Sequence, residues 1–237
     1  MPKIDAGKYG YANSGNVTSS FTNARETGQS ATNQPTGSDV KVAEFHTNAG
    51  KGARSWRMFR FFCAFDTSSY SSGYTISNLT FNYRNTSSTG CTPAICSPAF
   101  IIVKSTAQGS ADTDLSASDY FSDVVYSTAY SSSTAISLSA GDTSISLNAT
   151  AITDFGTGLL KVVMVQTLND YNDTTSTSNM QQEAYANFDA GSSGYVPFIE
   201  FDAVQTGYGN DVLGVSSGNI DDVLAVATAN IDKVLGV

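Results

Sequence analysis

Acidic side chains and one histidine are the first candidates for chemistry in this sequence. Asp112 and Asp114 form one close pair of carboxylates, and Asp170 and Asp173 form another, each within a polar stretch. Two such carboxylates can act as the acid and base of a glycosidase or bind calcium through their oxygens. Because charged side chains in polar loops are usually solvated, we expect surface charges instead. The single histidine, His46, lies in a strand-like run, which favours a structural role over a Ser-His-Asp triad. We therefore predict no catalytic residues.

The cysteines indicate neither a metal site nor a redox function. Cys91 and Cys96 lie in the run GCTPAICSP, where they either form a disulfide or stay as buried thiols. A zinc site would need further ligands, and His46 is distant in the sequence. Cys63 lies in FRFFCAF and is expected to be a core residue. The sequence therefore predicts no metal and no cofactor.

Aromatic residues gather in and just after a long polar stretch, residues 169–194. Aromatic faces beside Asn and Asp side chains suit the binding of sugars. The same residues could instead pack the stretch onto the rest of the domain. The candidate glycan-binding residues are Tyr171, Tyr185, Phe188 and Tyr195.

Residues 208–237 hold an internal repeat. Val212, Val223 and Val234 recur at a spacing of 11, and each opens a copy of V-L-(G/A)-V. Asn219 and Asn230 suit helix N-caps, so we expect single helical turns here instead of one long helix. One copy cannot bury its Val and Leu alone, so the repeat either packs on its own domain or binds a partner or further copies of the chain. The residues expected to make that contact are Val212, Leu213, Val215, Ile220, Val223, Leu224, Val226, Ile231, Val234, Leu235 and Val237.

The repeat resembles one found at the C-termini of tailed-phage virion proteins, of the type NIAKVNGVAxANIAKVNGV. The matching runs here are NIDDVLAV and NIDKVLGV. The resemblance implies a structural virion protein, such as a tail fibre, spike or capsid decoration subunit, whose partners are other virion proteins.

Composition narrows the classes of partner. Charged residues make up 14% of the chain and the net charge is −9, which argues against nucleic acid because no basic stripe is present to neutralise phosphates. No apolar run approaches the roughly 18 residues of a membrane span. The N-terminal run MPKIDAGKYGY lacks the apolar region of a signal peptide. We therefore expect a virion protein, assembled in the host cytoplasm and released by lysis.

The strand signals predict an all-β domain over residues 38–207, after an extended N-terminal arm at 1–37. Alternating or apolar runs bounded by turn residues predict strands, and Ala140-Gly141-Asp142 predicts a hairpin between two of them. A short helix or a long loop is expected over 112–126. The expected strands are 40–46, 55–66, 73–84, 98–106, 134–140, 143–149, 158–168 and 195–204.

The run at 55–66 is apolar on both faces. Trp56, Met58 and Arg60 alternate on one face, and Phe61 and Cys63 lie on the other. Such a strand belongs inside a sandwich, covered on both sides.

A second resemblance covers Arg60 through Tyr83. This run, RFFCAFDTSSYSSGYTISNLTFNY, is similar to the signature strands of DNRLRE-type and related carbohydrate-binding β-jelly-rolls. The resemblance implies a jelly-roll-like fold and concerns a structural hairpin, not a binding site.

Taken together, these observations predict a jelly-roll-like β-sandwich with a short C-terminal repeat (208–237) for anchoring or oligomerisation. The expected function is that of a non-enzymatic structural virion protein of a tailed phage, and we expect a homo-oligomer. The alternative is a carbohydrate-binding module for host attachment through a surface glycan, and the third hypothesis is a glycan-degrading enzyme.

Overall fold

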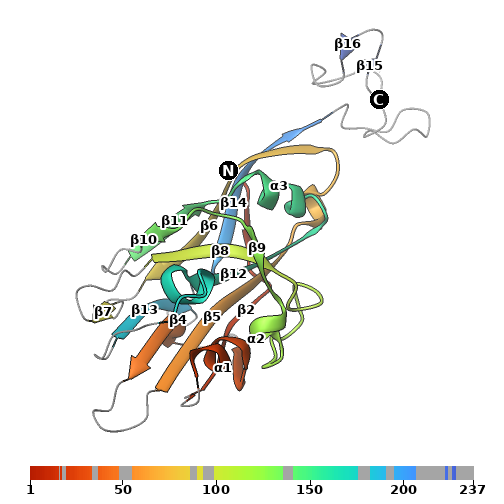
Figure 1. Ribbon diagram of the computed structural model, residues 1–237. Coiled ribbons are helices and arrows are strands. Elements are labelled where there is room, and N and C mark those ends of the chain that lie inside the picture. Colours follow the sequence, from red (N-terminus) through yellow and green to blue (C-terminus); the bar gives the residue numbers. More distant parts are fainter. Residues whose placement is uncertain are drawn as a thin grey trace.

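Two layers of antiparallel strands pack face to face in the protein (Figure 1), so the predicted all-β sandwich is confirmed. The computed structural model describes residues 1–15, 17, 20–33, 37–47, 55–85, 90–92, 99–135, 141–175, 182–190, 195–206, 222–223 and 226–227.

The first layer is built around β6. The C-terminal strand β14 pairs with one side of β6 and β11 with the other, and β1 pairs with the far side of β14. The bounds in spatial order are β1 (Lys3–Asp5), β14 (Phe198–Gln205), β6 (Tyr74–Asn85) and β11 (Gly141–Ser146).

The second layer is built around β5 and β12. β2 pairs with one side of β5, while β12 and β4 share the other side; β8 then follows β12. Beyond them, β3 pairs with β2, and β9 and β10 pair with β8. The bounds are β3 (Ser30–Asn33), β2 (Lys8–Asn13), β5 (Ser55–Asp66), β4 (Gly37–Thr47), β12 (Leu159–Gln166), β8 (Ala99–Ser105), β9 (Val124–Ala129) and β10 (Thr134–Ala135).

Strand β13 (Gln182–Ala190) joins the two layers. It pairs with β4 along most of its length and reaches β6 through the single register pair Phe188 and Asn85. The short strand β7 (Gly90–Thr92) also pairs with β13.

The main core lies between the layers. Phe61, Cys63 and Phe65 of β5 face Phe81 and its neighbours on β6, and all are at most 1% exposed. Each fully buried side chain of this size contributes about 1.5–3 kcal/mol through the hydrophobic effect.

A second core covers the outer face of β5 and β12. Trp56, Met58 and Phe62 point to this side, under α1 (Phe21–Glu26), α2 (Asp119–Ser122) and the segment before α2. Figure 1 shows α1 and α2 together at one end of the molecule and α3 (Ala149–Phe155) at the other. The prediction that β5 is covered on both faces is confirmed.

The N-terminal segment is part of the sandwich, where a separate extended arm was expected. β1 pairs with β14, and β2 pairs with β5 over Lys8–Asn13. Tyr9 enters the main core and Phe21 of α1 the second one. The scattered apolar residues of this polar segment are thus the ones that fix it to the two cores.

The hairpin predicted around Gly141 is a crossing between layers instead. β10 pairs with β8 in the second layer, whereas β11 pairs with β6 in the first. Alternation alone does not reveal which partner a strand selects, and burial of Ile145 in the main core favours β6.

Candidate functional site

A buried ion pair joins β5 to the segment after β12. Arg60, 0% exposed, donates from Nε and Nη2 to both carboxylate oxygens of Asp170 at 2.8 and 2.7 Å. Its remaining contacts are to main-chain carbonyls, with Nη1 donating to Tyr120 at 2.5 Å and Nη2 to Arg25 at 2.7 Å. The guanidinium also lies 3.9 Å from the ring centre of Tyr120. Burial acts to lower the pKa of Arg60, but the charge of Asp170, the nearby Tyr120 and Tyr126, and the hydrogen bond to Asp170 together raise that pKa overall.

Further groups complete this cluster, which we call the Arg60 cluster (Arg25, Arg60, Tyr120, Tyr126 and Asp170). Arg25 Nε donates to the main-chain oxygen of Asp170 at 2.8 Å, and the Tyr126 hydroxyl donates to its Oδ1 at 2.7 Å. Burial, and next to it the Asp170 charge, raise the pKa of Tyr126. Gln166 positions the aspartate because its Oε1 accepts from the main-chain N–H groups of Asn169 and Asp170.

The Arg60 cluster corrects the expectation that Asp170 and Asp173 are both solvated. Asp170 is only 2% exposed, because the buried guanidinium needs a partner inside the protein. Asp173 does lie at the surface and faces Arg25 Nη1 at 3.5 Å. Since Asp170 is fully engaged by Arg60 and Tyr126, this aspartate pair is a structural element and not an acid–base pair.

The other aspartate pair lies at the surface as predicted. Asp112 and Asp114 are exposed, and Asp114 forms an ion pair with Lys8, whose Nζ lies 2.9 Å from Oδ1. Within the described residues no group of three or more His, Cys, Asp or Glu side chains could hold a metal ion.

A pocket of about 290 Å³ opens where β8 ends and β12 begins. We call it the Lys161 pocket; it is lined by Lys104, Ser105, Thr106, Tyr130, Asp154, Thr157, Leu159 and Lys161. Helix α3 delivers Asp154: its first turn is capped by Asn148, whose side chain accepts from two backbone N–H groups, and Phe155 fixes its last turn in the main core. The register of β8 and β12 places Lys104 on the inter-layer side of the sheet and Lys161 on the outer side, and both residues line the pocket at the end of the ladder.

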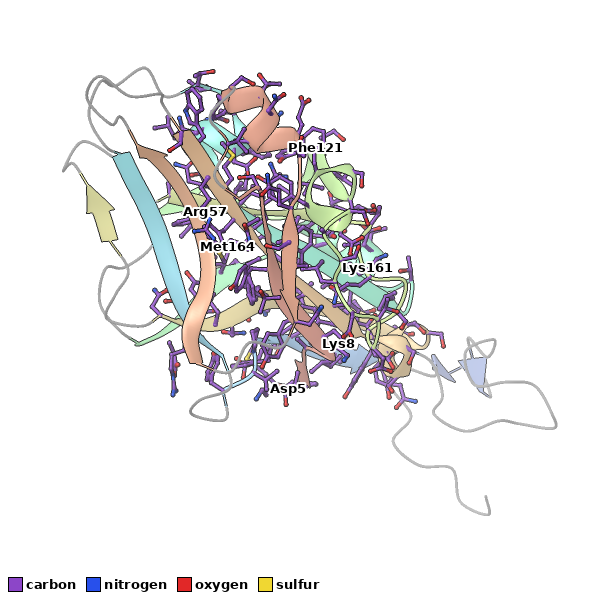
Figure 2. All side chains as sticks on the ribbon, turned by 90° about the horizontal axis from the view of Figure 1, so that it is seen from below. Asp5, Lys8, Arg57, Phe121, Lys161 and Met164 are labelled. Atoms are coloured by element: carbon purple, nitrogen blue, oxygen red, sulfur yellow. The ribbon has the colours of Figure 1, made fainter. Side chains whose placement is uncertain are left out.

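Opposite charges meet in the Lys161 pocket. Asp154 Oδ2 accepts from Lys104 Nζ at 2.9 Å and from the Tyr130 hydroxyl. Burial opposes ionisation of Asp154, yet these hydrogen bonds lower its pKa overall. Lys161 Nζ donates to the main-chain oxygens of Thr106 at 2.9 Å and Gln108 at 3.2 Å, and so reaches the loop after β8 (Figure 2).

The surroundings of Lys161 lower its pKa. Desolvation is the largest cause that lowers its pKa, and repulsion from Lys104 acts in the same direction. Asp123 and Asp119 oppose this shift without cancelling it. Burial, and not a lack of nearby carboxylates, is thus the main cause of the lowered pKa of Lys161.

Neither of these two sites was predicted from the sequence, although Asp170 was one of the candidate carboxylates. Arg60 had a usable signal, because a charged residue in the otherwise apolar run of β5 requires a buried partner. Lys104, Asp154 and Lys161 had none, since they come from three elements whose meeting depends on sheet order.

The described aromatic candidates lie in different surroundings. Tyr171 packs against the second core, 6.4 Å from Tyr126 between ring centres. Tyr195 lies beside the first layer, 6.0 Å from the ring of Phe198 and under the guanidinium of Arg84. Tyr185 and Phe188 belong to β13, and their side chains lie outside the described part, as does that of His46. Tyr171 and Tyr195 therefore do not form a shared platform for a sugar.

Most of the C-terminal repeat also lies outside the described residues. Of the expected contact residues, Val223 and Val226 are described as register partners in the short antiparallel pair β15 (Asp222–Val223) and β16 (Val226–Ala227). The helical turns expected in the repeat concern residues that lie almost entirely outside the described part of the chain. Val212, Leu213, Val215, Ile220, Leu224, Ile231, Val234, Leu235 and Val237 lie outside the description.

Cys63 is a free, buried thiol in the main core, as predicted, and burial raises its pKa. The disulfide alternative for Cys91 and Cys96 concerns side chains outside the described residues. Among the described helices, none combines the length and apolar character needed to cross a membrane.

Comparisons with known proteins add no relative: no protein family, no curated protein and no solved structure matches this chain.

Proposed function

We propose that this protein is a non-enzymatic structural subunit of a tailed-phage virion, a fibre, spike or decoration protein, that is attached through its C-terminal repeat. The observation that carries the proposal is the in-register recurrence of V-L-(G/A)-V in residues 212–237 behind a β-sandwich. Other virion proteins or further copies of the chain are the partners.

The strand that leads into the repeat is suited to bear a load. β14 is hydrogen-bonded to β1 on one side and to β6 on the other, and it continues to Gln205. Its Ile199 and Phe201 are 0% exposed. A force on the repeat would therefore act along a strand held by two ladders and by the main core.

The surface of the sandwich also supports an attachment made by the repeat and not by the sandwich. Among the described residues, the exposed large hydrophobic side chains are Met1, Tyr74, Leu168 and Val204. Tyr74 and Val204 lie on neighbouring strands at the end where the chain leaves β14 toward the repeat. The described part of the body thus offers little apolar surface for association, whereas the repeat is rich in Val and Leu.

Truncation tests the proposal directly. A chain lacking residues 209–237 should stay folded, with an unchanged melting temperature, but should be lost from purified particles. Light scattering of the two forms separates the partners: an oligomer that falls to monomer marks self-assembly, and two monomers mark docking on another virion protein. Incorporation of the truncated chain at the normal level would refute attachment through the repeat.

A matched pair of full-length variants tests whether the truncation acts only because it shortens the chain. Replacing Leu213, Leu224 and Leu235 together by Ser removes one apolar position from every copy and should abolish incorporation. Replacing the polar, equally spaced Ser217 and Thr228 by Ala should leave incorporation intact. Equal behaviour of the two variants would contradict the assignment of the apolar positions as the contact.

A further inference from the structure

Strand β11 forms an edge of the first layer. It pairs with β6 over Gly141–Ser146, and no other described strand pairs with its far side. Just after β11, Leu147 N donates to Leu79 O at 2.8 Å, so the alternation of an antiparallel ladder makes the odd-numbered residues of β11 bond to β6. The even-numbered residues direct their main-chain N–H and C=O groups away from the sheet; they are Asp142, Ser144 and Ser146.

We propose that β11 pairs with β11 of a second copy of this chain, as two antiparallel strands related by a two-fold axis at Ser144. The first layers of the two copies then form one continuous sheet. This inference concerns the sandwich, goes beyond the proposed attachment through the repeat and does not depend on it.

The pairing is self-complementary, as a two-fold contact between identical strands requires. Ser144 lies opposite the second copy's Ser144, and Asp142 lies opposite the second copy's Ser146. Residues at these positions form hydrogen-bonded pairs, each of which exchanges both of its N–H···O bonds. All the outward-facing main-chain groups of β11 thus find partners in this one register.

Charge favours the same register. Asp142 is the one charged residue of β11, and its two carboxylate oxygens accept from Arg84 Nε at 2.7 Å and Nη2 at 3.2 Å. The pairing places a serine hydroxyl opposite this carboxylate, and a hydroxyl can donate to it. A slip that brought the two copies of Asp142 opposite each other would be unfavourable, because like charges that face each other across strands are destabilising.

Other described edges carry features that protect against such pairing, which are short length, charge, bulges or covering groups. β1 has three residues, two of them charged, and the register of β9 with β8 is shifted. At the end of β3, the Asn33 side chain bonds the main chain of Leu115. β11, by contrast, has a regular register with β6, and nothing lies within 4 Å of the position that a Cβ would take at Gly141.

The contact should be weak, because it uses the main chain of one short strand and little apolar surface. We expect a dissociation constant on the order of 1 mM, as for a small and transient interface. Dilute protein therefore stays unpaired through this edge. Attachment of several copies to one particle would raise their local concentration and favour the pairing.

Disulfide trapping of the full-length chain tests the register. The Cα atoms of a hydrogen-bonded antiparallel pair lie about 5.5 Å apart, within reach of a disulfide. Ser144→Cys should therefore give a linked dimer under mild oxidation of concentrated protein. Ser146→Cys is the matched control, since Ser146 is an exposed serine of the same strand, but its two copies would lie more than about 13 Å apart. Wild type shows the background from the natural cysteines.

A charge variant tests the contact without a covalent bond. Ser144→Lys places two ammonium groups opposite each other and should weaken self-association by about tenfold or more, as measured by sedimentation equilibrium up to about 2 mM protein. Ser77→Lys makes the same change at an exposed position of β6, away from the edge, and should leave self-association unchanged. Unchanged melting temperatures show that the variants are folded.

Three results would overturn the proposal. One is a disulfide yield for Ser144→Cys no higher than that of Ser146→Cys or of wild type. Another is wild-type protein that stays monomeric at the highest concentration, and the third is self-association that Ser144→Lys leaves unchanged. None of these results bears on incorporation into particles, so a failure of the edge contact is distinguishable from a failure of attachment through the repeat.

Discussion

The Arg60 cluster and the Lys161 pocket both bring opposite charges together, but they differ in how completely those charges are used. Arg60 is 0% exposed, and its guanidinium donates to Asp170 and to two main-chain carbonyls. In the pocket, the side chains of Lys104 and Asp154 are 35% and 23% exposed, and the lysines keep free donors. A closed and satisfied network contributes its stability inside the protein, whereas the charges of an open one are partly screened by water.

The difference follows from the elements that supply the charges. Arg60 comes from β5, a strand covered on both faces, where any charge needs a partner within reach. The segment after β12 brings Asp170 to it under α1 and α2. Lys104 and Lys161, by contrast, lie at the ends of β8 and β12, where the sheet stops and solvent begins. Position in the sheet thus decides which cluster is structural.

The largest effect is expected from breaking the Arg60 cluster. Arg60→Met leaves the buried Asp170 carboxylate with only the more distant cation of Arg25, whose Nε lies 3.7 Å from Oδ1, and this should lower the free energy of unfolding by about 3–5 kcal/mol. Chemical denaturation followed by circular dichroism measures this loss. Arg60→Met combined with Asp170→Leu removes both charges and should recover part of it. A double variant as unstable as the sum of the two single variants would show that the pair is not coupled.

Comparison of the two sites also shows what the sequence could predict. The long strand β5 and the sandwich were predictable, because a run that is apolar on both faces requires a layer on each side. Asp170 was misjudged because its neighbours Asn169, Tyr171 and Asn172 are polar or amphipathic, so local composition indicated a solvated loop. Its burial depends on Arg60, 110 positions away in the sequence.

The arrangement around the Lys161 pocket depends on still more distant information. Its position requires that β8 neighbours β12 and that the chain crosses between layers before α3, where a hairpin was expected. Sequence patterns define strands and their faces, but several strand orders bury the same faces equally well. The meeting of Lys104, Asp154 and Lys161 is therefore a property of topology and not of any local pattern.

A smaller effect is expected at alkaline pH, from Tyr126, one of the two tyrosines of the Arg60 cluster. Burial, followed by the charge of Asp170, raises the pKa of Tyr126 in the folded protein. The stability linked to this shift is fully present below the unfolded-state pKa of about 10. It is lost as the pH rises above that value, by about 1.4 kcal/mol per pH unit. Urea unfolding of wild type and Tyr126→Phe between pH 9 and 11 should show a shallower decline for the variant, and identical slopes would exclude this linkage.

The smallest effect is expected from the ion pair of the pocket. Asp154→Asn removes the charge that Lys104 and Tyr130 contact, but the pair is partly exposed and therefore screened, so the loss of unfolding free energy should be at most about 1 kcal/mol. Because the pKa of Asp154 is lowered in the folded state, despite burial, this contribution is present above the unfolded-state value of about 4 and disappears as the pH falls.

Asp170→Asn is the matched partner of this variant, since it makes the same chemical change in the closed cluster. Its cost should be several times larger and nearly independent of salt, because water and ions do not reach a side chain that is 2% exposed. The cost of Asp154→Asn should shrink further in 1 M NaCl. If both variants lost the same stability with the same salt dependence, exposure would not separate the two sites. The ion pair of the pocket would then contribute to the fold as strongly as the buried one does.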